Sequence, residues 1–389
     1  MKNKIIRTAT VAGSLNSFLR DQVKFLNTYY DVIALSGLDA DLLEVKNRSG
    51  VRIIDVSMER KIAPFKDVMS LIKLIKVFRK ERPLIVHSIT PKAGLLTMLA
   101  GKIAGVPIRM HTFTGLIFPT RTGIMQKLLI RMDQLLCWAA TNIYPEGNGV
   151  KNDLVSYSIT KKPLKVLANG NVNGIDLEHF EKSQLEDSQL KELQKDLGIC
   201  DSDFVFVFVG RLVGDKGINE LVNAFSKLKE DGVDQVKLLL VGPYEEELDP
   251  LKQETLNAIS FDKDIISVGY QKDVRPYFAI SDVLVFPSYR EGFPNVVIQA
   301  GAMELPSIVS DINGSNEIIE NGVNGVIIPV KNINAIKDNM LKLIRDQNAL
   351  EFLKTNSRRI IKERYDQQIV WNALLNEYKE LVEKLNNKE

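Results

Sequence analysis

Short apolar runs rich in β-branched residues alternate along the chain with longer segments in which apolar residues recur every three or four positions. The short runs are typical of strands and the longer segments of helices. The strand-like runs of the first half are IIRTATV, DVIALS, VRIIDV, LIVHSI and IRMHTF, and helices are expected near residues 17–28, 67–80, 93–104 and 123–138. Those of the second half are FVFVFVG, VKLLLVG, IISVGY, VLVFPS and SIVSD, again with helical segments between them.

This alternation predicts an α/β protein with two parallel sheets and crossover helices. The fully apolar FVFVFV indicates a strand that is covered on both faces. Between the halves lies KKPLKVLANGNVNGID, which is rich in Pro, Gly and Asn and marks a domain boundary near residue 165. We therefore expect a first domain at residues 1–165, a second at 166–355, and a helical segment at 356–389 that packs back on the first domain.

The composition indicates a globular protein with two cores. The chain has 389 residues, of which 45% are hydrophobic and 26% are charged, and such a length exceeds what one core usually supports. Cys137 and Cys200 show neither metal-type nor disulfide-framework spacing, which favours a reducing compartment. The first apolar run is interrupted by Arg7, and nowhere do eighteen apolar residues run together. We expect a cytoplasmic protein without a membrane span.

The charge distribution is uneven, although the net charge is only +2. Residues 1–165 contain 26 Lys and Arg against 12 Asp and Glu, whereas the remainder contains 25 against 37. Many of the basic residues lie on two amphipathic helical segments, near residues 66–82 and 121–131. A solvated helix face explains either segment alone, but the excess over the whole domain favours an anionic membrane surface or a lipid-linked diphosphate. Nucleic acid is disfavoured because no aromatic platform or nucleic-acid module is present.

A glycine-rich turn follows the run FVFVFVG. In GRLVGDKGINELVNAF, Arg211 and Lys216 flank the turn at the point where a helix opens. Free N–H groups at a helix start, together with a guanidinium and an ammonium group, suit a diphosphate. An ordinary strand-to-helix turn with surface cations is the alternative.

A second candidate turn follows VLVFPS, in YREGFPNVVIQAGAM. Pro294 and Asn295 mark a helix start whose free N–H groups could bind phosphate oxygens. Glu291 precedes this turn and can accept hydrogen bonds from two neighbouring sugar hydroxyls, and Gln299 can bond a ribose. The alternative for Glu291 is a solvated loop acid.

These motifs together resemble the GT-B glycosyltransferases, specifically the retaining family 4 enzymes that build bacterial capsular and lipid-linked polysaccharides. The resemblance covers nearly the whole chain. It rests on GRLVGDKG, VFPSYREGFPNVVIQAGAMELPSIVSD, NEIIENGVNGVIIP, ANGNVNGIDLEHF and RKIAPFKDVMSLIKLIKVFRKERPLIVHSITPKAGL. It implies two Rossmann-like doubly wound domains facing each other across a cleft, the first binding the acceptor and the second the nucleotide sugar.

The resemblance also implies the activity. The enzyme would transfer a sugar with retention from a nucleotide sugar, preferably a UDP-hexose or UDP-N-acetylhexosamine, to a polyprenyl-diphosphate-linked or other glycan. It would need neither a metal nor a cofactor, and it would contact the inner face of the membrane peripherally. Arg211, Lys216, Glu291 and Thr114 would form the reacting site. The donor would be bound by Gly13, Ser14, Gly210, Gly269, Tyr270, Gly292, Phe293, Pro294, Asn295, Val296 and Gln299.

Two positions depart from the family pattern. Gln299 replaces the second of two glutamates, and Thr114 replaces a histidine near the reacting sugar. An amide still accepts from a ribose hydroxyl, so weaker donor binding is expected rather than loss of activity. His111, three residues before Thr114, should point elsewhere.

The acceptor candidates are His87, Lys92 and Arg60. His87 follows the run LIV and either contacts the acceptor or caps the strand, whereas Lys92 at a helix start suits an acceptor phosphate. The pair Asp39 and Asp41 imitates a metal-binding motif but lies in the basic domain, so a metal site is not expected there.

Two alternatives stay open, and a third is disfavoured. A nucleotide-sugar epimerase of the same fold needs the same diphosphate site, and a non-catalytic sugar-nucleotide-binding protein is compatible with the altered Thr114 and Gln299. A dinucleotide-dependent oxidoreductase would need a Gly-x-Gly-x-x-Gly turn after the first strand, and the segment AGSLNSF does not supply it.

Overall fold

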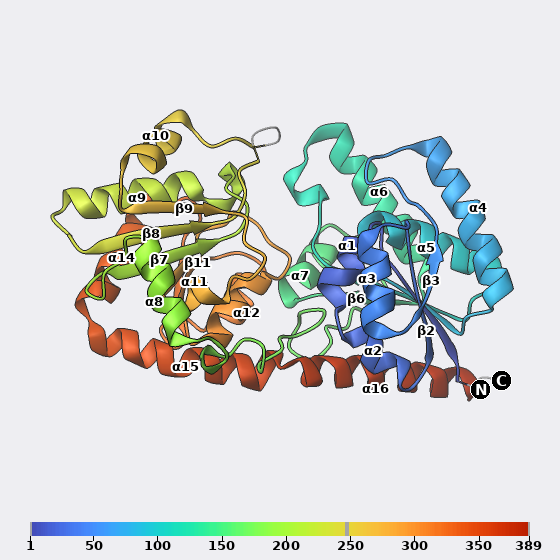
Figure 1. The fold of residues 1–389 in the computed structure, drawn as a ribbon. Coiled ribbons are helices and arrows are strands. Elements are labelled where there is room, and N and C mark those ends of the chain that lie inside the picture. Colours follow the sequence, from blue (N-terminus) through green and yellow to red (C-terminus); the bar gives the residue numbers. More distant parts are fainter. Residues whose placement is uncertain (1, 246–248, 388–389) are drawn as a thin grey trace. The chain divides into compact units, whose positions relative to one another are not determined.

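A computed structural model describes residues 2–245 and 249–387, and the chain divides into two compact units (Figure 1). Unit 1 comprises Met1–Gly174 and Gln367–Glu389, and unit 2 comprises Ile175–Asp366. The boundaries lie nine and eleven residues later than the expected 165 and 355. The linker stays with unit 1 because Leu164 bridges to Ile143 and the N–H of Asn171 donates to the Glu146 carbonyl at 2.9 Å.

The sheet of unit 1 has six parallel strands in the order β3-β2-β1-β4-β5-β6. This is the strand order of a Rossmann-type sheet, and its reversal lies between β1 and β4. The edge strand β6 was not anticipated from the sequence. The bounds are β1 Lys4–Thr8, β2 Asp31–Ser36, β3 Arg52–Asp55, β4 Ile85–Ser88, β5 Ile108–Phe113 and β6 Asn142–Pro145.

Helices cover both faces of this sheet. On one face α5 packs against both α4 and α6, and on the other α1, α2, α3 and α16 pack together. Pro64 and Pro91 occupy first-turn positions of α4 and α5, where a missing N–H costs nothing. The helices are α1 Ala12–Leu19, α2 Gln22–Asn27, α3 Ala40–Ser49, α4 Pro64–Glu81, α5 Pro91–Ala104, η1 Phe118–Thr120, α6 Gly123–Ala139, α7 Asn148–Ser156 and α16 Gln367–Asn386.

The expected single helix at residues 17–28 is wrong. The chain forms α1 and α2 instead, because Arg20 adopts a positive φ of 28° and ends α1. Helix α1 begins at Ala12, so the donor-binding candidates Gly13 and Ser14 lie in its first turn.

The C-terminal helix α16 is anchored to unit 1 through buried polar contacts. The hydroxyl of Tyr378 lies 2.7 Å from Nδ1 of His87 and accepts from Arg7 at 3.3 Å. The hydroxyl of Tyr144 donates to Glu377 at 2.8 Å, and Lys165 pairs with the same carboxylate. The C-terminal helix thus packs on unit 1, but only from residue 367, because residues 356–366 belong to unit 2.

The sheet of unit 2 repeats the same topology in the order β12-β11-β10-β7-β8-β9. All pairs are parallel, and the order reverses between β7 and β10. The short edge strand β12 was also not anticipated. The strands are β7 Phe204–Val209, β8 Val236–Val241, β9 Ile265–Gly269, β10 Val283–Phe286, β11 Ser307–Ser310 and β12 Gly325–Ile328.

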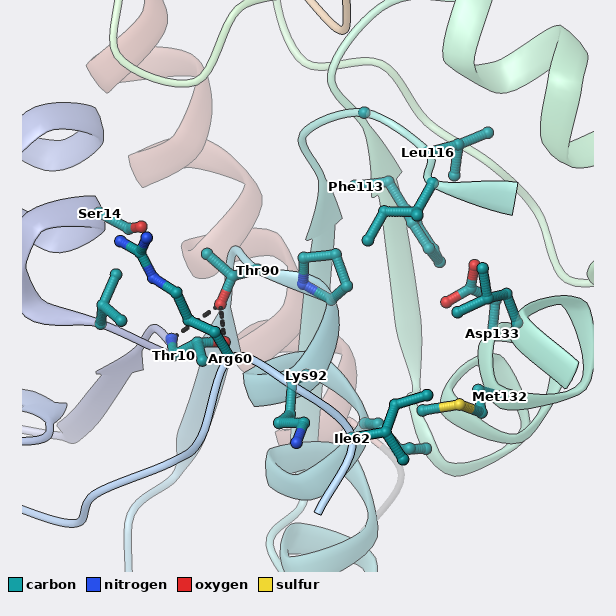
Figure 2. Close-up of a pocket in the computed structure, with 16 residues that line it drawn as sticks. Thr10, Ser14, Arg60, Ile62, Thr90, Lys92, Phe113, Leu116, Met132 and Asp133 are labelled. Atoms are coloured by element: carbon teal, nitrogen blue, oxygen red, sulfur yellow. Dashed lines mark hydrogen bonds between the residues drawn. The ribbon is translucent and has the colours of Figure 1, made fainter. Parts of the chain in front are cut away.

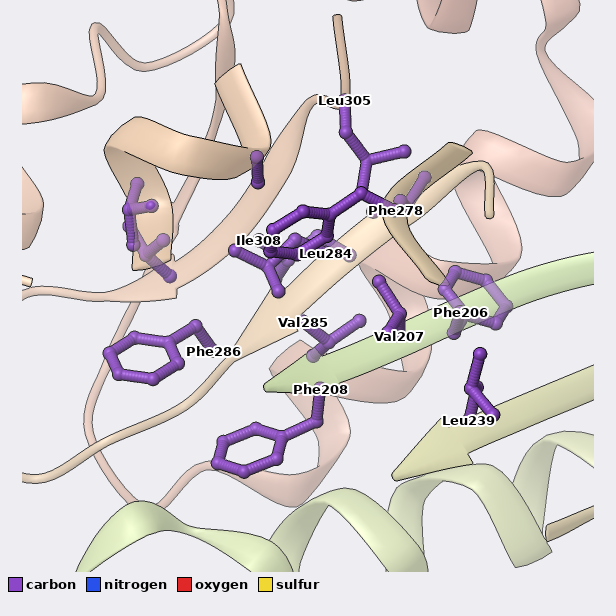
Figure 3. Close-up of a cluster of buried hydrophobic side chains, with 14 of the residues drawn as sticks. Phe206, Val207, Phe208, Leu239, Phe278, Leu284, Val285, Phe286, Leu305 and Ile308 are labelled. Carbon is purple, nitrogen blue, oxygen red and sulfur yellow. The ribbon is translucent and has the colours of Figure 1, made fainter. Parts of the chain in front are cut away.

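The core of unit 2 is built around β7 and β10 (Figure 3). Phe206 and Phe208 lie two positions apart on β7, and both are fully buried. The ring of Phe208 stacks on that of Phe286, with 5.7 Å between the ring centroids. The helices are η2 Lys182–Gln184, α8 Asp187–Asp196, η3 Gly214–Lys216, α9 Ile218–Glu230, α10 Gln253–Phe261, α11 Arg275–Ala279, α12 Asn295–Ala302, α13 Ser315–Ile318, α14 Ile333–Arg345 and α15 Gln347–Tyr365.

Two features bear on the membrane. Within residues 2–245 and 249–387, no helix combines the length and the apolar content that crossing a bilayer requires. On unit 1, large apolar side chains are exposed along α4 and α6: Phe65, Val68, Met69, Ile72, Ile124, Met125, Leu128, Leu135 and Trp138. We call these residues the α4/α6 apolar face.

Candidate functional site

The candidate residues of unit 2 meet at the point where its strand order reverses. Arg211 and Lys216 follow β7, and Glu291 follows β10, which is the neighbouring strand. Ligands of open parallel sheets bind beyond the carboxyl ends of the strands at such a reversal. The two turns are also joined directly, since the N–H of Tyr289 donates to the carbonyl of Asp215 at 2.8 Å.

Lys216 and Glu291 form an ion pair at the centre of this region. The ammonium group of Lys216 contacts Oε1 of Glu291, and the hydroxyl of Ser288 donates to the same oxygen at 2.9 Å. Among the residues that the structure describes, Oε2 of Glu291 has no hydrogen-bond partner. The carboxylate is thus fixed by two contacts and keeps one oxygen for a ligand, while its lysine partner supplies positive charge beside it.

Glycines allow these two turns to approach. Gly217, at a positive φ of 73°, ends the Lys216 turn, and an added Cβ would lie 2.2 Å from the carbonyl oxygen of Pro287. Gly314, at a φ of 75°, approaches the turn after Glu291, where an added Cβ would lie 2.6 Å from the carbonyl oxygen of Gly292. Only glycine permits this conformation and this distance without strain.

Arg211 lies beside the same turn and is half-exposed. Its guanidinium pairs with Glu245, so a diphosphate would exchange this carboxylate for phosphate oxygens. Gly210, directly before it, adopts a φ of 152° and marks the end of β7. Arg211 and Lys216 therefore both place positive charge beyond the carboxyl end of β7.

Helix α12 starts at Asn295, as the sequence predicted. Pro294 is its N-cap residue and makes no side-chain cap bond, but the N–H of Val297 donates to the carbonyl of Pro294 at 3.1 Å, so the first turn offers fewer N–H groups to a ligand than the sequence predicted. Phe293 and Pro294 are buried, Gly292 and Val296 are half-buried, and Asn295 is exposed.

The base-binding and ribose-binding candidates lie at the edges of this region. Gln299 is half-buried on α12, and no described residue bonds its side chain. Gly269 ends β9 with a φ of 67°, and the ring of Tyr270 that follows is 73% exposed, as a stacking platform needs to be. Their roles toward a nucleotide stay predictions.

Unit 1 contains a cavity of about 290 Å³ at the reversal of its own sheet (Figure 2). Thr10 follows β1 and Thr90 follows β4; their hydroxyls lie 2.8 Å apart, and the N–H of Thr10 donates to Thr90 at 2.8 Å. The lining residues are Thr10, Val11, Ser14, Arg60, Ile62, Thr90, Pro91, Lys92, Leu95, Phe113, Gly115, Leu116, Ile117, Leu129, Met132 and Asp133.

Two of the three acceptor candidates line this cavity. Arg60 is exposed and has no ion-pair partner among the described residues. Lys92 contacts both oxygens of Asp67, at 2.8 and 3.0 Å, and also the carbonyl of Lys61. Lys92 therefore already holds the start of α4 in place, and Arg60 is the cation that is free to bind a phosphate.

The third candidate, His87, does not reach this cavity. It is buried, and its two ring nitrogens contact Tyr378 at 2.7 Å and Thr112 at 2.8 Å, beside a separate cavity of about 20 Å³. Burial lowers the pKa of His87 well below its ordinary range, so the ring is neutral. Contact with an acceptor is thus not supported, because His87 has no free polar atom to offer.

The threonine in the histidine position also has a partner. Thr114 is half-buried, and its hydroxyl donates to the carbonyl of Ile89 at 2.9 Å, which leaves its lone pairs for a ligand. His111 is buried against Ser88 at 2.8 Å, and burial lowers its pKa to about 3. As expected, His111 points away from the candidate site.

Asp133 lines the unit 1 cavity and was not predicted from the sequence. A single acid on a basic amphipathic helix gives no signal of burial. The pair Asp39 and Asp41 is structural: Asp39 caps α3 by accepting from the N–H of Leu42 at 3.0 Å, and Asp41 accepts from Asn16 at 3.0 Å.

Family models match both halves of the chain. Residues 190–360 match the model described as glycosyl transferases group 1, and residues 10–145 match the model described as glycosyl transferase 4-like. The chain is 33% identical over 380 residues to the capsular polysaccharide biosynthesis glycosyltransferase CapM of Staphylococcus aureus, with 97% of each chain covered. It is 30% identical to the UDP-Gal:alpha-D-GlcNAc-diphosphoundecaprenol alpha-1,3-galactosyltransferase of Escherichia coli, over 77% of this chain and 76% of that protein.

Solved structures agree on the fold. The glycosyltransferase from Rickettsia africae superposes with a TM-score of 0.82 at 20% identity, covering 98% of this chain and 99% of that one. Anabaena HepE in complex with UDP superposes with a TM-score of 0.81 at 17% identity, covering 98% of this chain and all of that one. Together with the family models and the similarity to CapM, this shows that the chain belongs to the group 1 glycosyltransferases and has the GT-B fold.

Proposed function

We propose that this glycosyltransferase takes a hexose or N-acetylhexosamine from a UDP-sugar and transfers it, with retention, to a polyprenyl-diphosphate-linked glycan in surface polysaccharide assembly. The observation that carries the donor half is the Lys216–Glu291 contact at the sheet reversal of unit 2. The acceptor half is supported by the E. coli relative, whose name gives a UDP-galactose donor and a diphosphoundecaprenol-linked acceptor.

The residues of unit 2 have distinct roles in the proposed reaction. The bond between the anomeric carbon and the leaving phosphate oxygen breaks, and charge develops on the diphosphate. Lys216, Arg211 and the N-terminal end of α12 stabilise that charge. Glu291, held by Lys216 and Ser288, accepts from two sugar hydroxyls and fixes the ring.

Retention requires that the new bond form on the face from which the diphosphate leaves. The acceptor oxygen attacks the anomeric carbon on the face that the diphosphate leaves, and the departing phosphate oxygen takes the acceptor proton. No carboxylate nucleophile is needed, and Glu291 serves as a ligand to sugar hydroxyls. Because the two cations offset the developing charge, we infer that donor binding needs no Mg²⁺.

A thermal-shift panel of nucleotide sugars with EDTA, followed by transfer, tests this proposal. A UDP-sugar should raise Tm in EDTA and then transfer its sugar to farnesyl-diphosphate-linked N-acetylglucosamine, and NMR of the product should show the donor's anomeric configuration. An inverted linkage or a strict Mg²⁺ requirement for donor binding would contradict the mechanism. An epimerised sugar nucleotide formed without acceptor would indicate an epimerase, and binding without turnover a sugar-nucleotide-binding protein.

We also propose that unit 1 rests on the cytoplasmic face of an anionic membrane. The α4/α6 apolar face is flanked by Lys66, Lys73, Lys76, Lys127 and Arg131, all exposed. Exposed apolar side chains between cations are typical of helices that lie in the headgroup region. A polyprenyl-linked acceptor would be met there, because its lipid stays in the bilayer.

A further inference from the structure

The cavity of unit 1 has polar groups at two separate places and apolar side chains between them. Figure 2 shows Arg60, Thr10 and Thr90 on one side and the carboxyl of Asp133 on the other. Its volume of about 290 Å³ is at the lower end of the range for small-molecule sites. A ligand that fills it must therefore be polar at both ends.

Asp133 is an unusual acid for this unit. It is half-buried and lines the cavity together with Leu116, Leu129 and Met132, and no described residue donates a hydrogen bond to its carboxyl. Burial raises its pKa to about 7. A carboxyl that is kept in apolar surroundings without a partner has hydrogen-bonding capacity that the fold itself does not use.

Other shielded acids of unit 1 are paired. Asp67 binds Lys92, and Glu81 binds both Lys4 and Arg52. Glu377 accepts from Tyr144 and pairs with Lys165. Structural acids in this unit thus have partners, and Lys92, the lysine of the same cavity, is already held by Asp67.

The opposite side of the cavity can bind phosphate. Arg60 is a cation without an ion-pair partner among the described residues, and the hydroxyl groups of Thr10, Ser14 and Thr90 lie near it. If an anion of the ligand binds at Arg60, another part of the same ligand faces Asp133, and that part must donate a hydrogen bond. A sugar hydroxyl or an N-acetyl N–H is such a donor, and a carboxyl accepts from either.

We propose that Asp133 is a specificity-determining residue that binds a polar hydrogen on the first sugar of the acceptor, while Arg60 binds the diphosphate. The inference rests on the proposed lipid-linked acceptor and adds which group of it is read. Because the carboxyl is shielded and has no partner within the fold, a hydrogen bond to it favours an acceptor that carries a matching donor.

Equilibrium binding to two probes tests this inference without requiring turnover. The probes are farnesyl-diphosphate-linked N-acetylglucosamine and farnesyl diphosphate, which lacks the sugar. Asp133→Leu should lower the affinity for the sugar-bearing probe about tenfold and leave farnesyl diphosphate unchanged. Arg60→Ala should weaken both probes. Glu383→Gln, which neutralises an exposed acid of α16, is the control and should change neither.

Each outcome decides one question. If Asp133→Leu weakens both probes equally or neither, Asp133 does not read the sugar and the inference is wrong. If the unaltered protein binds neither probe, the lipid-linked acceptor itself is wrong, and the inference falls with it. Asp133→Asn keeps the shape and an accepting oxygen, so it should retain part of the discrimination, and a loss as large as that of leucine would contradict a hydrogen-bonding role.

Discussion

At the scale of single residues, the fold explains contacts that spacing alone could not predict. The sequence predicted that Lys216 and Glu291 bind a donor, because each follows a strand and precedes a helix. It did not predict that they touch, since 75 positions separate them. The contact arises because β7 and β10 are neighbours at the sheet reversal and Gly217 lets the two turns approach.

Lys216→Ala should reduce transfer at least about 100-fold, because one preorganised charge at a developing anion typically contributes that much. The fold should persist, since Glu291 keeps its bond to Ser288. Transfer rates and Tm are the measurements. Lys263→Ala, at an exposed lysine of the same unit, is the control. Transfer by Lys216→Ala at the normal rate would remove Lys216 from the mechanism.

The position of Asp133 in the cavity wall could not be predicted from the sequence. On a segment that reads as a basic amphipathic helix, one acid resembles a solvent-facing residue. Only the packing of α6 beside the β5 end places it in an apolar wall. The same limit applies to His87, whose burial depends on Tyr378, a residue 291 positions away.

Asp133→Asn should stabilise the protein at pH 8. Burial raises the folded-state pKa of Asp133 to about 7, above its ordinary value of 3.8. The fold therefore loses stability as pH rises from about 4 to about 7, and the loss is complete at pH 8. The cations lining the same cavity, Arg60 and Lys92, oppose this only partly, and Cys137 stays neutral because burial raises its pKa to about 12. The amide removes the penalty, which is at most about 4 kcal/mol for a pKa raised from 3.8 to about 7.

Thermal unfolding at a series of pH values measures this difference. Tm of Asp133→Asn should exceed that of the unaltered protein by about 5 °C at pH 8, and the gap should close toward pH 4. A gap independent of pH would show that the carboxyl is not destabilised by ionisation. Stability and acceptor affinity should thus move in opposite directions, as is common for functional residues.

At the scale of elements, the alternation of short and periodic runs predicted the strands of both sheet centres, but it missed β6 and β12. Both are four-residue edge strands, and NIYP combines Asn and Pro with only two strand-forming residues. Such segments form strands because the neighbouring strand has free backbone N–H and C=O groups, and not because their own β-propensity is high. Among the helices of the first half, those predicted at 67–80, 93–104 and 123–138 match α4, α5 and α6, whereas the one at 17–28 was wrong and α3 and α7 were not predicted.

The α4/α6 apolar face should determine membrane binding. Phe65→Glu combined with Ile124→Glu removes two side chains that are 90% and 88% exposed and adds negative charge, so binding to phosphatidylglycerol vesicles should fall at least about tenfold. Because both residues are exposed, the fold should not change. Flotation with vesicles measures the bound fraction.

A matched control is available on α10 of unit 2. Phe261 is 86% exposed, and Phe261→Glu should leave flotation unchanged. Binding should also weaken at high salt, because part of it comes from lysines and arginines. Equal loss in the control and in the double variant would show a general charge effect rather than a binding face.

At the scale of the whole molecule, the sequence predicted two Rossmann-like domains, and the structure shows two sheets with one topology. What it could not predict is the path of the chain. Unit 2 is one continuous segment, whereas unit 1 is completed by α16 after the chain has left it. Boundary residues are decided by long-range pairing, such as the Asn171 bond to Glu146, which leaves no local pattern.

This asymmetry predicts different behaviour of the two halves when they are expressed separately. The fragment 175–366 contains the complete core of unit 2 and should fold and bind UDP, with a cooperative thermal transition. The fragment 1–174 lacks α16, which exposes the apolar surface that Leu374 and Leu375 cover and removes Tyr378 from the buried guanidinium of Arg7. It should unfold or aggregate, because an uncompensated buried charge is costly. Joining residues 367–389 to residue 174 through a flexible linker should restore a folded unit 1, whereas a well-folded 1–174 fragment would contradict a structural role of α16.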